Sequence, residues 1–510
     1  MQIPQWSDLA PWTKGSAAQY APLAHDSDTD EVESGLLSTE KRLPSATARG
    51  PITNKIVATF LALLQQLWMA TRPVILSPHG KRKLHPTSWL DGVRGLAAFF
   101  VFFSHGIDVR WSMSRGGWTH GDFFLRMPIF RIFYSGPGMV SVFFIVSGYA
   151  ISYKPLLLAR AREQSKVFDC LVSSTFRRGI RLYFPCAAFV IIGALIKYCH
   201  LEYRPKKTDP RAESLLSTIW WMVQVIIPGL NPLTLDRRWM NSTFKDFEPV
   251  MWTIPVEFRG SVCVFILILV VAKASRAMRL GALIVSLAYL TCVGQWDIFL
   301  FVMGTFACEI HHRRQLPTHD EHETKTTNVF SRVVRSIGLF LALLPITFLL
   351  SQPETMWKNG DVWLYDWLAA HTPGAWANNM EAGSLWRCAA AVSLIFLVEY
   401  SSTLQKFFMS RPIQYLGDIS FMLYLLHPWL LSTIGKRLVH IIFPLTDKLG
   451  WGMISETIGV VILLICFMPI LFWGSEIATK FIDRKGVDFA RWAEDRFYGV
   501  QRPIGPPKAS

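Results

Sequence analysis

Long apolar runs separated by short polar segments make up most of the chain from Leu90 to Trp473. A helix that crosses a bilayer needs about 20 predominantly apolar residues, and several of these runs reach or approach that length. Transmembrane helices are expected at Leu90–Ile107, Ile129–Tyr153, Leu182–Tyr198, Trp252–Ala272, Leu280–Val293, Trp296–Ile310, Val333–Ser351, Trp386–Ser402, Leu416–Ile434 and Ile454–Trp473. The pattern therefore predicts an all-α fold, a polytopic membrane helix bundle with about ten transmembrane helices.

Two further apolar stretches are too short to be counted as spans. Leu215–Pro228 ends at a Pro-Gly pair and is expected not to cross the membrane. Ile56–Met69 is about half a bilayer long at a rise of 1.5 Å per residue, which favours an interfacial or packing helix. The expected organisation is a disordered cytosolic tail (1–50), an interfacial segment (51–83), a membrane domain (84–480) and a cytosolic C-terminal tail (481–510).

The distribution of positive charge predicts the orientation of the bundle. The net charge is +15, and basic residues gather in segments 154–181, 273–279 and 311–332. These segments fall on one side if ten helices alternate, and an excess of Lys and Arg marks the cytosolic side. Both termini are then cytosolic, and we expect the protein to reside in the endoplasmic reticulum or another endomembrane.

The long segments 199–251 and 352–385 are expected on the outer side of the membrane. A basic group opposes this placement: Arg204, Lys206, Lys207 and Arg211. Asn241 begins an Asn-Ser-Thr tripeptide in the first of these segments and is a possible glycosylation site.

Charge and cysteine usage exclude other classes of protein. The basic residues are spread over short loops and form no basic stripe with interleaved aromatics, so no nucleic-acid partner is expected. The 8 cysteines contain no CxxC pair and most fall inside apolar runs, so neither a metal site nor a disulfide framework is predicted.

Arg94 and His105 are two ionisable residues within the first predicted span. Eleven positions place them within about 20° on one helical face and about 16 Å apart along the axis, with Arg94 toward the cytosolic end. Each could simply extend to its own interface, but His105 lies among Phe residues and gains little there. Ionisable groups inside a membrane usually serve a function. Arg is suited to gripping an anionic donor, and His to removing a hydroxyl proton.

Two other charged motifs are candidates for the same site. Arg177, Arg178 and Arg181 could anchor a helix at the cytosolic membrane edge, or could hold the phosphates of coenzyme A. Glu257 lies six positions into an apolar span and needs a partner. It could orient His105 and stabilise its imidazolium form, as a carboxylate does in a catalytic triad.

Two motifs have plausible structural explanations. Ser420, Tyr424 and His427 recur on one helical face and could either line a cavity or form an interhelical hydrogen-bond seam. The small residues of FFIVSGYAI, at Phe143–Ile151, favour close helix packing.

Together these motifs resemble the acyltransferase 3 family of integral membrane acyltransferases. The resemblance runs from about Leu90 to Trp473 and includes, in the family's order, the Arg–ten residues–His pairing, FFIVSGYAI, RRGIRLYFP, WTIPVEF and LGDISFMLYLLHP. One departure is Arg259-Gly260, where members tend to carry aromatic residues. The resemblance implies a ten-helix bundle, with His105 as the catalytic residue, Arg94 as its partner toward the donor, and Glu257 as the family's carboxylate.

The implied activity is transfer of an acetyl or longer acyl group from acyl-coenzyme A to a hydroxyl of a small-molecule natural product, lipid or glycan. Acyl-coenzyme A is then a co-substrate, and no bound cofactor is expected. The alternative from the residues alone is a proton-coupled multi-pass transporter, which would also use intramembrane Arg, His and Glu. Transporters often contain repeated halves with broken helices, and no such repeat is evident here.

Overall fold

The computed structural model describes residues 84–109, 126–203, 214–229, 231–232, 250–314, 329–353, 363–377 and 384–499. From Pro86 onward these belong to one compact unit, and only Leu84 and His85 of a second unit are described. The predictions for segments 1–50 and 51–83, the sequon at Asn241 and the basic residues 204–211 lie outside the described residues.

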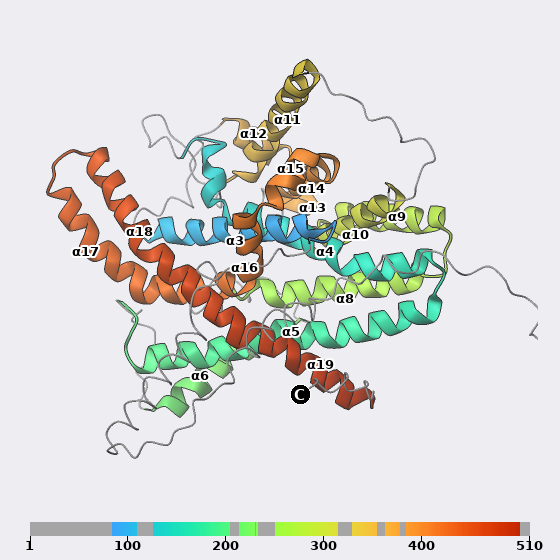
Figure 1. The fold of residues 1–510 in the computed structure, drawn as a ribbon, viewed down its shortest axis with the longest axis horizontal. Coiled ribbons are helices and arrows are strands. Elements are labelled where there is room, and N and C mark those ends of the chain that lie inside the picture. The colour runs from blue at the N-terminus through green and yellow to red at the C-terminus, as the bar shows by residue number, and fades with distance from the viewer. Residues whose placement is uncertain are drawn as a thin grey trace, which may run out of the picture. The chain divides into compact units, whose positions relative to one another are not determined.

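The described residues form helices and contain no strand, which confirms the all-α prediction. Figure 1 shows the arrangement of these helices. Their bounds are α3 Ser88–Asp108, η3 Phe130–Tyr134, α4 Gly136–Arg160, α5 Gln164–Tyr198, α6 Leu215–Gly229, α8 Thr253–Val271, α9 Arg276–Val293, α10 Trp296–Arg314, α11 Val329–Leu350, α12 Trp363–Ala370, α13 Gly374–Ala377, α14 Ser384–Tyr400, α15 Ser402–Phe408, α16 Arg411–Leu430, η4 Leu431–Gly435, α17 Lys436–Asp447, α18 Met453–Ala478, η5 Thr479–Asp483 and α19 Arg484–Tyr498.

Within the described part of the chain, seven helices are long and apolar enough to cross a membrane, or eight if α14 and α15, which bend by 101°, form one span. Among the ten predicted spans, α10 and α16 do not meet this criterion. α10 fails the criterion because Asp297 and Glu309 lower its mean hydropathy. Both carboxylates are nevertheless buried against arginines of neighbouring helices. Charges inside a membrane protein are tolerated when they are paired in this way.

The bundle exposes apolar side chains where it would meet lipid. Val270 on α8, Val285 on α9 and Ile465 on α18 are all largely exposed. Exposed apolar surface on this scale is abnormal for a monomer in water but suits a bilayer. The molecule is therefore an integral membrane protein.

The core is organised around α4, whose side chains pack against α3, α10 and α14. A side chain at Gly148 would collide with the backbone of Phe301 on α10, and one at Gly304 would collide with the backbone of Ile145. The FFIVSGYAI motif thus allows α4 and α10 to approach closely, as its small residues predict.

α3 and α16 form a second close crossing. A Cβ added to Gly95 would meet the backbone of Gly417, so only glycine allows this approach. Further along, His105 of α3 lies against His427 of α16, so the two helices run in the same direction.

The predicted ends of several helices differ from the observed ends. The span expected from Ile129 instead begins with a short 3₁₀ helix, and α4 starts at Gly136. Pro137 explains the boundary, because proline is favoured in the first turn of a helix. The span expected from Leu182 is the second half of the 35-residue α5. The expected C-terminal tail contains α19, which packs on α5.

Candidate active site

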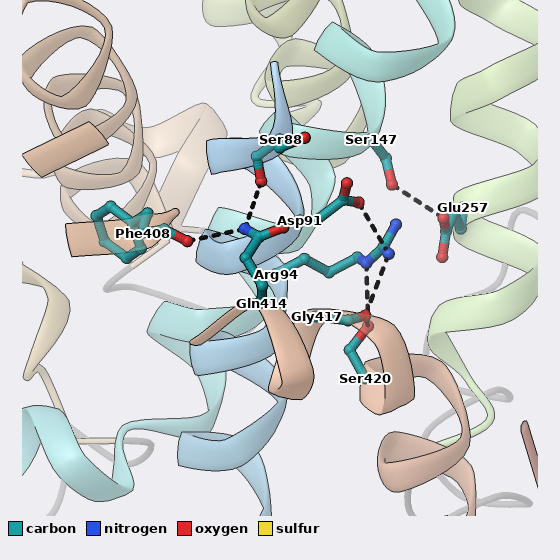
Figure 2. Close-up of polar contacts among 9 residues, drawn as sticks. All are labelled: Ser88, Asp91, Arg94, Ser147, Glu257, Phe408, Gln414, Gly417 and Ser420. Atoms are coloured by element: carbon teal, nitrogen blue, oxygen red, sulfur yellow. Dashed lines mark hydrogen bonds and ion pairs between the residues drawn. The ribbon is translucent and has the colours of Figure 1, made fainter. Parts of the chain in front are cut away.

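The side chain of Arg94 is held between α3 and α16. Its Nε donates a hydrogen bond of 3.0 Å to Ser420 Oγ, and its Nη2 lies 3.4 Å from the carbonyl oxygen of Gly417. The same Nη2 is 3.1 Å from a carboxylate oxygen of Asp91, one turn earlier on α3. Figure 2 shows these contacts. The guanidinium is therefore fixed in one orientation by three groups.

Glu257 lies beside this arginine and binds a second one. Its Oε1 accepts hydrogen bonds from Arg178 Nη2 of α5, at 2.8 Å, and from Ser147 Oγ of α4, at 2.9 Å. Figure 2 shows Arg94 extending toward the side on which Ser147 and Glu257 lie. Arg178 also donates from Nε to Ser261 Oγ at 2.7 Å. We call Arg94, Arg178 and Glu257 the arginine–glutamate cluster.

The cluster carries more positive than negative charge. Arg181 and Arg94 both act electrostatically on Arg178, so three guanidinium groups share this region with the carboxylates of Asp91 and Glu257. Arg178 and Glu257 are mostly buried, with side-chain exposures of 17% and 22%, while Arg94 retains 32%. A partly accessible guanidinium with a surplus of positive charge is suited to binding an anionic group.

The position of Arg94 differs from the membrane edge suggested by its place in the sequence. Trp89 at the start of α3 packs edge-on against Tyr149, with ring centres 5.8 Å apart. From Tyr149, α4 continues to Arg160, about 16 Å further. Thr87, Ser88 and Trp89 are buried accordingly. The N-terminal end of α3 is therefore recessed within the bundle, and Arg94 lies inside it.

The expected contact between Glu257 and His105 is not formed, and this part of the sequence interpretation was wrong. Glu257 is bound to Arg178 and Ser147, at the level of Arg94. His105 lies eleven residues further along α3, which is about 16 Å away. A carboxylate held at the level of Arg94 cannot reach an imidazole that far along α3.

The arginines of the RRGIRLYFP motif do not gather in one place, because neighbouring positions on α5 face different helices. Arg177 points to α19, where its Nε is 3.3 Å from a carboxylate oxygen of Glu494. Arg178 points to α8 and joins the cluster. Arg181 is half-buried and makes no hydrogen bond or ion pair with the described residues. Of the three, Arg178 is brought to Arg94 and Arg177 is not.

His105 faces His427 across the α3–α16 crossing. The ring centres are 5.3 Å apart, and the ring planes are inclined by 31°. Phe102 and Tyr424 contact the His427 ring, so the surroundings are aromatic and weakly polar. We call His105 and His427 the histidine pair. The sequence singled out both residues, but nothing in their spacing indicated that they would meet.

The three polar residues on one face of α16, Ser420, Tyr424 and His427, have different partners. Ser420 binds Arg94, and the Tyr424 hydroxyl is 3.1 Å from both the Thr253 hydroxyl and the Val250 carbonyl oxygen. These contacts are an interhelical hydrogen-bond seam. His427 does not join it, because its backbone contacts are within its own helix: Nδ1 is 3.1 Å from the Leu423 carbonyl oxygen, and the ring also interacts with the backbone of Tyr424.

The departure at Arg259-Gly260 has a packing explanation. Arg259 forms an ion pair with the buried Asp297 of α10, and a side chain at Gly260 would collide with the Phe301 ring. These residues therefore join α8 to α10, and neither belongs to the arginine–glutamate cluster or the histidine pair.

Sequence reasoning did not identify a group of buried ionisable residues around α10. Arg279 of α9 binds Glu309 at 3.1 Å, and His311 contacts Glu399 of α14, which also accepts a hydrogen bond of 3.2 Å from the Tyr149 hydroxyl. Charged residues within predicted spans were the available signal.

Comparison with known proteins identifies the family to which the chain belongs. The model of an acyltransferase domain family, Acyl_transf_3, matches residues 87–473. The chain is 27% identical to O-acetyltransferase PaAT-1 of Phomopsis amygdali over 449 residues, covering 83% of this chain and 88% of the relative. It is 22% identical to acyltransferase clz18 of Cochliobolus lunatus, covering 78% and 93% of the two chains. No solved structure matches. The chain therefore belongs to the acyltransferase 3 family of integral membrane acyltransferases, and it is an enzyme that transfers acyl groups other than aminoacyl groups.

Proposed function

We propose that this protein transfers an acetyl or other acyl group from acyl-coenzyme A to a hydroxyl of a small-molecule natural product, lipid or glycan. The observation that carries the proposal is the division of α3 into two functional ends. One end places Arg94 in the arginine–glutamate cluster, and the other places His105 against His427. The similarity to the O-acetyltransferase of Phomopsis amygdali supports a hydroxyl acceptor and an acetyl group.

His105 acts as the general base in this proposal. An alcohol is a poor nucleophile until its proton leaves, and imidazole titrates close to neutral pH. His105 takes the hydroxyl proton as the oxygen attacks the thioester carbonyl. The carbon–sulfur bond then breaks, and the coenzyme A thiolate leaves with the proton that His105 returns.

The arginine–glutamate cluster holds the donor. Coenzyme A is an anionic carrier, and guanidinium groups bind phosphate oxygens through paired N–H donors. Arg94 is the most exposed charged group of the cluster, so it is the part that a donor can reach. The donor enters from the cytosol, and its acyl end extends toward His105, about 16 Å further along α3. We further propose an endomembrane location with both termini in the cytosol.

The test is acyl transfer by purified protein. Detergent-solubilised enzyme would be incubated with acetyl-coenzyme A labelled in the acetyl group and with a panel of hydroxylated acceptors: terpenoid and polyketide alcohols, sterols, diacylglycerol and oligosaccharides. We expect label in at least one acceptor as an alkali-labile ester, together with stoichiometric free coenzyme A. Label recovered only on amines, or release of coenzyme A with no acylated product from any acceptor, would contradict hydroxyl transfer.

A further inference from the structure

We propose that His427 is the positioning residue of the active site: its bare Nε2 accepts a hydrogen bond from protonated His105 and stabilises that imidazolium. This inference rests on the proposed role of His105 as general base. It assigns to a neutral imidazole the task that a carboxylate has in a catalytic triad.

A base that receives a proton in an apolar setting needs a partner, because an isolated buried cation is costly. Glu257 cannot serve, since it is held by Arg178 and Ser147 at the level of Arg94, about 16 Å along α3 from His105. Asp108 is one turn along α3 from His105 and contributes to its electrostatic environment. The ring that lies directly against His105 belongs to His427.

The hydrogen bonding of His427 determines which of its nitrogens is free. Its Nδ1 is 3.1 Å from the Leu423 carbonyl oxygen, and a carbonyl only accepts, so in the neutral ring Nδ1 carries the proton. Nε2 is then a bare lone pair. This assignment follows from the hydrogen-bond geometry and not from observed hydrogens.

The free nitrogen is buried and has no partner. His427 is 0% exposed, and Nε2 makes no hydrogen bond with the described residues. A buried acceptor without a donor is destabilising, so such groups are rare unless they have a use. The nearest hydroxyl on the same face, that of Tyr424, is already engaged with Thr253 and Val250.

The separation of the rings suits a shared proton. No hydrogen bond joins the two histidines in this structure, but ring centres 5.3 Å apart leave room for one N–H···N contact of about 3 Å between edges. The contact forms when the half-buried His105 ring turns so that one of its N–H groups points at His427 Nε2.

The proton balance of the step is simple. The acceptor hydroxyl gives its proton to one nitrogen of His105, whose other nitrogen already carries hydrogen. That second N–H donates to His427 Nε2 while the oxygen–carbonyl bond forms and the carbon–sulfur bond breaks. The proton then leaves on the thiolate of coenzyme A, and His105 returns to its neutral form, while His427 stays neutral throughout.

Three substitutions separate this role from packing. His427→Gln keeps an acceptor near the position of Nε2, His427→Asn keeps a group near Nδ1 only, and His427→Met keeps neither. We expect kcat to fall about tenfold to a hundredfold for Met and Asn and clearly less for Gln, with KM for acyl-coenzyme A within about threefold throughout. His440→Gln, at an exposed position on α17, and Asp108→Asn are the controls.

A double substitution supplies the deciding readout. Because His427 would act only through His105, the His105→Ala/His427→Met enzyme should be no slower than His105→Ala alone. Equal kcat for the Gln, Asn and Met variants and wild type would overturn the inference while leaving hydroxyl transfer intact. Additive losses in the double variant, or a greater loss from Asp108→Asn than from His427→Met, would also overturn it. A wild-type enzyme with no acyl transfer would refute the proposed function, and this inference with it.

Discussion

The arginine–glutamate cluster and the histidine pair both include a residue of α3, yet their polar groups are arranged in opposite ways. In the cluster Arg94 has three partners, and Glu257 accepts from both Arg178 and Ser147. In the pair the His105 ring lies against the His427 ring and makes no hydrogen bond with the described residues, and His427 Nε2 has no hydrogen-bond partner among them. A binding group gains from being held rigidly before the ligand arrives, whereas a base must keep a lone pair free for the proton it receives.

Replacement of His105 should give the largest loss of turnover. It removes one member of the histidine pair and leaves the arginine–glutamate cluster unchanged. His105→Ala should lower turnover about a hundredfold or more, because the hydroxyl loses its base. The protein should still fold, since His105 is half-buried and its side chain makes no hydrogen bond with the described residues. Turnover per mole of purified protein and its elution on size exclusion would be compared with wild type. Near-normal turnover at normal expression would refute the role of His105.

Replacement of Glu257 should break the cluster. Glu257→Ala leaves Arg178 buried without its carboxylate, which should cost about 2–3 kcal/mol of stability, less than for a fully buried pair. Thermal unfolding in detergent would measure the loss. Adding Arg178→Met should recover part of it, because the uncompensated charge is then removed. A double variant less stable than Glu257→Ala would show that the pairing is not what Glu257 supplies.

A substitution at the helix crossing should affect both regions together. Gly95→Ala places a methyl group against the backbone of Gly417, so α3 and α16 must move apart at a cost of about 1–3 kcal/mol. Gly281→Ala on α9 is the matched control, because no atom lies within 4 Å of its added Cβ. We expect a lower melting temperature and lower turnover for Gly95→Ala only. Equal behaviour of the two variants would mean that the crossing tolerates separation.

Replacement of Arg177 should have the smallest effect on stability and on KM for the donor. It tests whether Arg177, next to Arg178 in the sequence, also contributes to donor binding. Arg177→Ala removes an ion pair between the partly exposed Arg177 and the buried Glu494, which retains a further interaction. Because that interaction remains and the arginine is partly solvated, the loss should be about 1 kcal/mol, and KM for acyl-coenzyme A should stay close to wild type. Arg178→Ala, measured in parallel, should impair both. A large rise in KM from Arg177→Ala would extend the donor site to α19.

The spans and the candidate residues could be predicted from the sequence because each depends on local pattern. Apolar run length identifies helices, and an ionisable residue inside a run is conspicuous, as Arg94, His105 and Glu257 were. Partners could not be predicted in the same way. Glu257 was assigned to His105, but its true partner, Arg178, is on a helix whose rotation the sequence does not reveal.

Helix boundaries also depended on information beyond hydropathy. The basic segment 154–181, expected to be a cytosolic connection, is almost entirely helical, and α5 continues through Pro185. The meeting of His105 and His427 depends on the glycine contact at Gly95 and Gly417, which brings together residues more than 300 positions apart.

The division of α3 into a donor-binding end and a chemical end can be tested most directly by comparing kinetic constants of Arg94→Lys and His105→Ala for acyl-coenzyme A. Lys keeps the charge but loses the planar fork that Ser420, Gly417 and Asp91 hold in place. Arg94→Lys should raise KM for the donor about tenfold with kcat within about threefold, and His105→Ala should lower kcat with KM nearly unchanged. If Arg94→Lys leaves KM for the donor at the wild-type value, or if His105→Ala changes KM alone, the two ends do not have these separate roles.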